Sequence, residues 1–168
     1  MKGRKVMGRN LFDLHPWLRK KAGKVILLAK DQLKVDVLVY CTTRTFAEQD
    51  ELYSKGRGKP GDIVTWARAG ESYHNYGMAF DFVPYKPGTM MPDWKNDKVL
   101  QAVGEIGEDL GLQWGGRWPG KKRDPPHLQS SFGLSVHELQ VLYEIDGLGK
   151  VWWKIDKLLD RRKREGDQ

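Results

Sequence analysis

A chain of 168 residues with 39% hydrophobic and 30% charged residues has the size and composition of one soluble globular domain, expected to span residues 1–168. Its single cysteine, Cys41, excludes an internal disulfide and a cysteine-rich zinc site. No stretch approaches the roughly 20 apolar residues of a transmembrane segment, and the first residues lack the apolar core of a secretory signal.

The net charge of +7 is concentrated at the two ends of the chain. Residues 1–24 carry eight Lys and Arg against one acidic residue, and residues 150–168 carry seven against four. The part between them has 14 basic and 17 acidic residues, a net charge of −3. Basic ends favour a polyanionic partner such as nucleic acid, anionic lipid or an anionic wall polymer, although a solvated basic surface explains them equally well.

The first predicted element is a helix over residues 13–33. Asp13 can cap its N-terminus, and Pro16 is compatible with a first helical turn. A β-strand is expected next, within residues 34–44, because valines alternate there with other residues. This alternation predicts that one side of the strand faces the core.

Capping boxes indicate two further helices. Thr45 with Glu48 begins one that should end near Lys55, and Ser135 with Glu138 begins another. The remaining predicted elements are a strand over 77–85, a helix over 96–112, a turn-rich segment that becomes extended towards 129, and a basic amphipathic helix at about 150–168. Few strands joined by long loops predict an α+β fold with a small antiparallel sheet and helices packed against it.

Two of the four histidines lie in segments that favour a ligand role. His15 and His137 fall in the first turns of predicted helices, where a structural or exposed role is the ordinary one. His74 and His127 lie in Gly- and Pro-rich segments beside a carboxylate. Cys41 follows the apolar run VDVLVY, which favours a buried, inert thiol over a nucleophile.

A catalytic zinc takes three protein ligands from His and Asp or Glu and leaves a fourth position for water. His74, Asp81 and His127 can supply this set if the chain turns at Gly77, since glycine adopts the required conformations. Asp124 precedes His127 by three residues, and two prolines stiffen the segment between them, which suits a base held near the metal. Taken singly, each residue also fits a structural role.

Four sequence blocks, taken together, resemble one family: the zinc peptidases of the D-Ala-D-Ala carboxypeptidase and L-alanyl-D-glutamate endopeptidase group, of the M15 type, and especially single-domain phage endolysins. The blocks are TRTFAEQDELYSKGR, GDIVTWARAGESYHNYGMAFDF, WGGRW and DPPHLQ, and they lie between about residues 39 and 129. The pattern S-x-H-x-x-G-x-A-x-D is matched by Ser72, His74, Gly77, Ala79 and Asp81.

The resemblance implies a hedgehog/DD-peptidase-like fold, zinc bound by His74, Asp81 and His127, and Asp124 as the general base. It also implies that Arg44 lines the cleft and faces a substrate carboxylate or the developing oxyanion. A surface salt bridge is the alternative for this arginine.

Gln49 and Ser72 are implied to bind substrate in the same cleft. The chain departs from the pattern of many relatives at Pro125-Pro126 and Leu128, where they have a single residue before the proline and an aromatic residue after the histidine. This departure removes no ligand but can alter the substrate groove.

We therefore expect a zinc-dependent peptidoglycan hydrolase of the endolysin type, which cuts the L-alanyl-D-glutamate bond of the stem peptide. It should be a monomer that stays in the host cytoplasm until it reaches the cell wall. Peptidoglycan is the expected partner and nucleic acid is not, while the basic ends can bind anionic wall polymer or membrane.

Two alternatives remain open at this point. One is a D-Ala-D-Ala carboxypeptidase of the same group, and the other is a non-catalytic zinc- or wall-binding protein. Cobalt or manganese can also occupy a His/His/Asp site.

Overall fold

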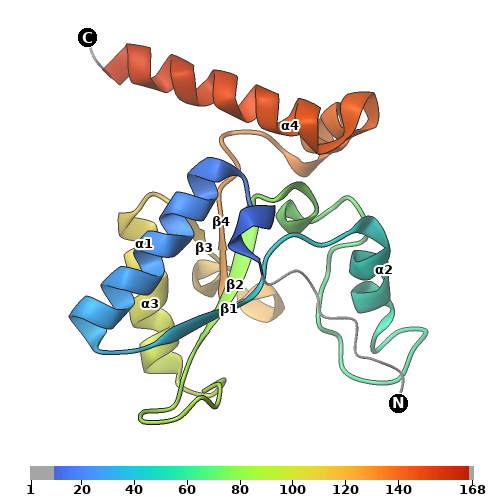
Figure 1. Cartoon of the computed structure of the whole chain (residues 1–168). Coiled ribbons are helices and arrows are strands. Elements are labelled where there is room, and N and C mark those ends of the chain that lie inside the picture. Colours follow the sequence, from blue (N-terminus) through green and yellow to red (C-terminus); the bar gives the residue numbers. More distant parts are fainter. Residues whose placement is uncertain (1–9, 167–168) are drawn as a thin grey trace.

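The computed structural model describes residues 10–166, and within this range four α-helices surround a four-stranded antiparallel sheet (Figure 1). The predicted α+β class is confirmed. In chain order the elements are α1 (Pro16–Leu33), β1 (Val37–Cys41), α2 (Phe46–Ser54), β2 (Ala79–Pro84), α3 (Asp97–Asp109), β3 (Gln113–Trp114), β4 (His127–Gln129) and α4 (Val136–Gly166). Short 3-10 helices lie at Leu11–Asp13, Tyr73–Tyr76, Gly115–Arg117 and Gly120–Lys122.

The sheet has the strand order β1-β2-β4-β3, and each neighbouring pair is antiparallel. The segment predicted to become extended towards residue 129 is in fact two short strands, β3 and β4, which pair with each other and are joined by a loop. This loop, residues 115–126, leaves the sheet between them. The central strand β2 is rigid, and its neighbour β4 is preceded by this long loop. Functional sites often lie where a loop meets such a rigid scaffold.

One face of the sheet packs against α1 and α3, which lie on the same side of it in Figure 1. Phe80 and Phe82 of β2 and Leu128 of β4 are fully buried in this core. Successive side chains of a strand point to opposite faces, so Asp81, between the two phenylalanines, points away from the core. The packing of this apolar face therefore fixes which side of the sheet receives the carboxylate.

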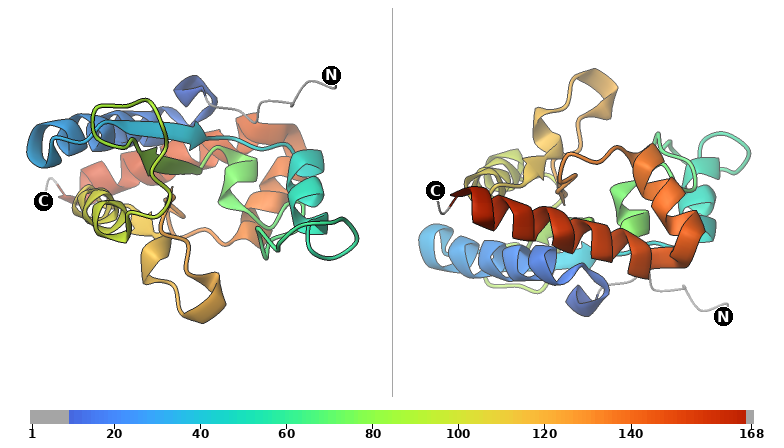
Figure 2. Two further views of the ribbon diagram at one scale, coloured as in Figure 1. Left: turned by 90° about the horizontal axis from the view of Figure 1, so that it is seen from below. Right: turned by 90° about the horizontal axis from the view of Figure 1, so that it is seen from above.

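The C-terminal helix α4 covers a second, smaller core and lies across the molecule beside α1 (Figures 1 and 2). Its Val151 and Ile155 are buried together with Tyr76 and Met78, which flank the turn into β2. A kink at Asp146 and Gly147 divides α4, so the two predicted helices are confirmed as two segments. No helix among residues 10–166 is long and apolar enough to cross a membrane.

The predicted N-cap of the first helix is wrong by two residues. His15, not Asp13, is the N-cap of α1, and its Nδ1 accepts a hydrogen bond from the Trp17 N–H at 3.2 Å. The backbone N–H of His15 donates to the Gly77 carbonyl at 3.0 Å, and His15 has the non-helical angles φ −47° and ψ 136°, as suits a residue before proline. A tertiary hydrogen bond thus decides the helix boundary.

Both predicted capping boxes are confirmed. Thr45 and Glu48 exchange hydrogen bonds at the start of α2, and Ser135 and Glu138 do so at the start of α4. His137, in the first turn of α4, is exposed, as expected for a histidine without a ligand role.

Candidate metal centre and active site

The backbone brings the predicted ligand residues together from three directions. Asp81 on β2 lies directly opposite His127 on β4 in the antiparallel register. His74 comes from the 3-10 helix Tyr73–Tyr76, which ends at Gly77. Gly77 has φ +69°, and a Cβ there would approach the Trp152 ring to 3.0 Å, so the turn requires glycine. The predicted turn at this glycine is confirmed.

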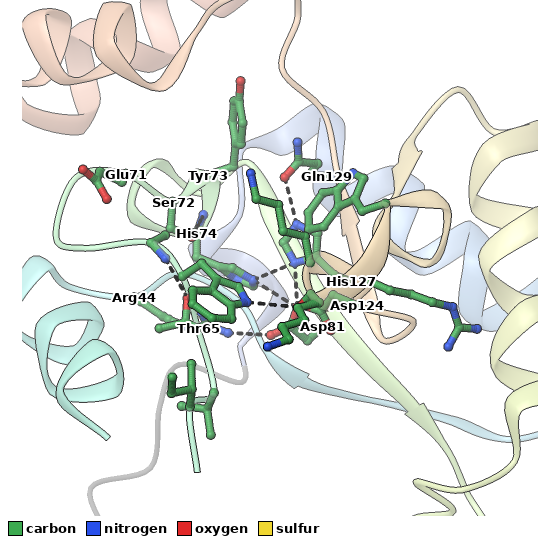
Figure 3. Close-up of a pocket in the computed structure, with 18 of the residues that line it drawn as sticks. Arg44, Thr65, Glu71, Ser72, Tyr73, His74, Asp81, Asp124, His127 and Gln129 are labelled. Atoms are coloured by element: carbon green, nitrogen blue, oxygen red, sulfur yellow. Dashed lines mark hydrogen bonds and ion pairs between the residues drawn. The ribbon is translucent and has the colours of Figure 1, made fainter. Parts of the chain in front are cut away.

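Three nitrogen and oxygen atoms converge at the centre of this site (Figure 3). Asp81 Oδ1 lies 3.0 Å from His74 Nε2 and 2.9 Å from His127 Nδ1, and the two nitrogens are 3.2 Å apart. A tetrahedral ion with bonds of about 2.0–2.1 Å separates its ligand atoms by about 3.3 Å. All three side chains are buried, and their spacing fits a single metal ion.

The outward nitrogen of each histidine faces a hydrogen-bond acceptor. His74 Nδ1 lies 2.6 Å from the Thr42 carbonyl oxygen, and His127 Nε2 lies 2.9 Å from Gln129 Oε1. A neutral ring that donates from its outer nitrogen presents a lone pair at the inner one. The three converging atoms are then all acceptors, and a cation between them satisfies all three at once.

The electrostatics of the site favour the deprotonated forms of His74 and Asp81 but not of His127, whose pKa burial lowers but the hydrogen bond and charge of Asp81 raise overall. Burial lowers the pKa of His74 to about 4, and Arg44 adds to this effect. Burial alone would raise the pKa of Asp81, but the adjacent His74, His127 and Arg44 hold it well below its ordinary value. A carboxylate and neutral imidazoles are the forms that coordinate metals.

Cys41 lies close to the same site but is a poor ligand. Its Sγ accepts a hydrogen bond from Arg44 Nε at 3.0 Å, and it faces the outward side of His74, 4.0 Å from Nδ1. Burial raises the pKa of the thiol to about 11. The predicted buried cysteine is confirmed, and its geometry supports the inert interpretation.

Asp124 lies next to the converging atoms, with a carboxylate oxygen within 4.8 Å of the ligand atoms of Asp81 and His127. Its N–H donates to the Gly115 carbonyl at 2.9 Å, and its own carbonyl accepts from the His127 N–H at 3.1 Å. A Cβ on Gly115 would lie 2.6 Å from the Asp124 carbonyl oxygen, so the WGGRW block permits this close approach. Burial and the charge of Asp81 raise the pKa of Asp124.

Arg44 lines the cavity, as the resemblance implied, but its guanidinium is held by protein partners. Its Nη2 is 2.5 Å from Asp81 Oδ2, its Nε contacts Cys41, and its Nη1 donates to Gln49 Oε1 at 3.3 Å. The side chain is 12% exposed, so this is a buried ion pair rather than the surface salt bridge considered as an alternative. Arg44 thus orients a ligand carboxylate from the side away from the histidines.

Gln49 and Ser72 have different positions. Gln49 is fully buried outside the cavity lining, and its Nε2 donates to the Ala67 carbonyl at 2.8 Å. It therefore supports a loop instead of reaching substrate, which differs from the prediction because the first turn of α2 points this side chain inward. Ser72 does line the cavity, and its Oγ accepts from the His74 N–H at 3.4 Å.

A cavity of about 580 Å³ opens above the site. Sequence reasoning missed several residues around it. Trp118 lies over His127 with ring centroids 5.1 Å apart, and Tyr40 reaches the cavity because a bulge interrupts β1 between Val39 and Cys41. Gln129 could have been predicted to lie near the site. It follows His127 by two residues on one strand, and such residues point to the same face of a sheet.

Comparison with known proteins identifies the family. Residues 66–130 match the M15 peptidase family model described as D-alanyl-D-alanine carboxypeptidase. The chain is 43% identical over 125 residues to the peptidoglycan L-alanyl-D-glutamate endopeptidase CwlK of Bacillus subtilis, a match that covers 70% of this chain and 73% of CwlK. It is 33% identical over 116 residues to the L-alanyl-D-glutamate peptidase of Listeria phage A118, covering 67% of this chain but only 37% of the phage enzyme.

The fold agrees with a solved structure. The crystal structure of the Serratia marcescens L-Ala D-Glu endopeptidase ChiX matches with a TM-score of 0.51 and 27% sequence identity, covering 76% of this chain and 88% of ChiX. Fold and site thus define a metal-dependent peptidase. The chain belongs to the M15 peptidase family, as the sequence blocks predicted.

Proposed function

We propose that the protein is a zinc-dependent peptidoglycan hydrolase that cleaves the L-alanyl-D-glutamate bond of the stem peptide. The observation that carries this proposal is the convergence of three acceptor atoms, from His74, Asp81 and His127, at the floor of a cavity. The names of the two curated relatives and of the structural neighbour, all L-alanyl-D-glutamate peptidases, support the choice of bond.

Two nitrogens and one carboxylate oxygen suit zinc, which when bound supplies a Lewis acid and lowers the pKa of water to about 7. Asp124 is the group that accepts the proton from the attacking water and passes it to the leaving amine. Its position beside the ligands and its raised pKa both support this assignment. His74, Asp81 and His127 would hold the ion at the floor of the cavity, which has room for the substrate carbonyl.

We assign Arg44 a positioning role. Each of its three nitrogens contacts a protein partner, so the guanidinium fixes the orientation of Asp81 rather than binding substrate. Ser72 lines the cavity and is the nearer candidate for a substrate contact. Gln49 does not contact substrate in this assignment. It supports the site indirectly, through its hydrogen bonds with Arg44 and with the Ala67 carbonyl of the loop after α2.

Digestion of purified peptidoglycan tests the function. The metal-loaded protein should release fragments whose new N-terminus is glutamate, identified by mass, and the L-alanine should stay on the glycan side. A chelator should stop the release, and added zinc should restore it. Release of free D-alanine alone would contradict the choice of bond.

A carboxypeptidase acting on terminal D-alanine is the second candidate, favoured by the description of the matching family model. The same digest separates it from the endopeptidase because the two activities yield different masses. A protein that binds one equivalent of zinc and releases neither product would be a non-catalytic wall-binding protein. Zinc analysis of the purified protein therefore accompanies the digest.

A further inference from the structure

The cavity above the metal centre has two walls of opposite character. On one side the loop after α2 presents Ile63, Val64 and Trp66, which are 43%, 56% and 49% exposed. The cationic segment Lys121–Arg123 also lines the cavity. Apolar side chains left open at a cavity mouth mark a place for a ligand. A cavity lined by apolar and by cationic side chains fits a ligand that is itself part apolar and part anionic.

Hydrogen bonds hold the two walls in place. The indole Nε1 of Trp66 donates to the Lys121 carbonyl at 3.0 Å and so joins one wall to the other across 55 positions of sequence. Gln49 donates to the Ala67 carbonyl and fixes the apolar wall from below. The cationic segment is therefore held by a hydrogen bond to the loop after α2, which is itself held by Gln49.

The cationic segment is also fixed to the proposed base. The Arg123 N–H donates to the Gly120 carbonyl at 3.2 Å, and the next residue, Asp124, donates to the Gly115 carbonyl at 2.9 Å. These bonds fix the backbone of the cationic segment relative to Asp124, whose carboxylate lies beside the ligand atoms.

None of the three cations forms an ion pair with a carboxylate of residues 10–166. Arg117, only four residues earlier, is paired with both Glu105 and Glu108. Three consecutive like charges without a counter-charge repel one another, and an anionic ligand relieves this repulsion. Unlike Arg117, the side chains of Lys121–Arg123 are therefore available to an anionic ligand in the cavity.

The chemistry of the proposed substrate supplies that anion, so this inference rests on the proposed function. When an alanyl-glutamate bond is cut, the leaving amine belongs to glutamate. One of the two carboxyl groups of this glutamate forms the peptide bond to the next residue of the stem peptide. The other carboxyl is a free carboxylate unless it is amidated, and it lies within a few bonds of the amine that Asp124 protonates. We propose that Lys121–Arg123 bind this free carboxylate and make the enzyme select acidic over amidated stem peptides.

Binding of the reaction product tests this subsite without turnover. Calorimetry would compare two peptides that begin with D-glutamate, one with its free carboxylate and one with the carboxamide, on the zinc-loaded protein. We expect the carboxylate to bind about tenfold more tightly, and the triple variant Lys121→Gln, Lys122→Gln, Arg123→Gln to lose this difference. The matched control, Lys157→Gln, Lys163→Gln, Arg164→Gln on α4, removes the same charges from an exposed helix and should keep it.

Kinetics on the corresponding uncut peptides complete the test. The triple variant should raise KM for the acidic substrate about tenfold, leave kcat within about twofold, and leave the amidated substrate unaffected. Equal binding of both products by the wild-type protein would overturn the inference, and so would an equal effect of the control variant. Failure of the proposed function is a separate result, in which peptidoglycan stays uncut whichever product binds.

Discussion

The metal centre and the contact between α1 and α4 each bury a histidine, but they use it in opposite ways. His74 and His15 are both 1% exposed. His74 Nδ1 faces the Thr42 carbonyl, whereas His15 Nδ1 accepts from the Trp17 N–H. The second nitrogen of His74 faces two further acceptors, while that of His15 lies 3.3 Å from Asp156 Oδ1. What the second nitrogen faces, not burial, distinguishes the candidate ligand His74 from the structural His15.

The surroundings of the two rings explain the difference. His15 lies among aromatic side chains, 5.5 Å from Trp152 and 6.4 Å from Phe132 between ring centroids. Burial there joins the N-terminus of α1 to the C-terminal helix and contributes to stability. His74 lies among a carboxylate, an arginine and a second histidine, where the convergent acceptors need a cation. Substitution of His74 should therefore reduce metal binding and activity, whereas substitution of His15 should reduce stability.

Replacing His74 with Ala should have the largest effect. The variant loses one of three ligands, so we expect less than one equivalent of bound zinc and no detectable hydrolysis of peptidoglycan. Metal analysis and a turnover assay on the same sample measure both. His15→Ala is the control, with full zinc content and lower stability. A full equivalent of zinc in the His74 variant would refute its role as a ligand.

Replacing Asp124 with Asn should reduce turnover by about 10²–10⁴-fold and leave zinc bound, because the amide keeps the size of the side chain but accepts no proton. Turnover and zinc content are measured together. Unchanged lytic activity would show that another group is the base. Loss of zinc in this variant would instead make Asp124 part of the metal centre.

Replacing Gln129 with Ala should weaken zinc binding about 10–100-fold. Its Oε1 faces His127 Nε2 at 2.9 Å, and its Nε2 donates to Gln113 Oε1, so the amide holds the ring in orientation. Competition with a chelator of known affinity measures the change. Gln101→Ala, at an exposed position on α3, is the matched control and should match the wild type. Equal affinities for both variants would mean that the ring needs no support from this side.

The sequence predicted the members of the site better than their contacts. His74, Asp81 and His127 could be named because metal coordination needs particular residue types. A turn at Gly77 followed by a predicted strand showed how they can meet. Their roles as ligands, and that of Asp124 as the base, stay predictions that the geometry supports. The location of the protein in a host cytoplasm before release also stays a prediction.

Long-range contacts were beyond the reach of the sequence. The ion pair between Arg44 and Asp81 spans 37 positions, and nothing in the block around Arg44 indicates which side it faces. Gln49 was expected in the cleft but is directed inward by α2. Tyr40 lines the cavity because of a bulge in β1. This bulge depends on the pairing between β1 and β2, which the sequence pattern of β1 alone does not specify.

The smallest expected effect is a pH dependence of stability at His15. Burial lowers its pKa below the ordinary value of 6.5, although Asp156 opposes this effect. Above pH 6.5 the ring is neutral in both the folded and the unfolded chain, and its contribution to stability is fully present. As the pH falls from 6.5 towards the lower folded pKa, only the unfolded chain binds the proton, so the free energy of unfolding decreases progressively over this range.

His15→Asn isolates this contribution, because asparagine can still cap α1 but does not titrate. Urea unfolding of both proteins between pH 8 and pH 5 gives their free energies of unfolding. The advantage of the wild type should shrink as the pH falls through this range, since only the wild type carries the buried imidazole. Titrations at the metal centre affect both proteins alike and cancel in the difference. A constant difference from pH 8 to pH 5 would show that His15 is protonated as readily in the folded chain as in the unfolded one. An advantage that grows as the pH falls would show instead that the contact between α1 and α4 depends on an ion pair with Asp156 rather than on a neutral ring among aromatic side chains.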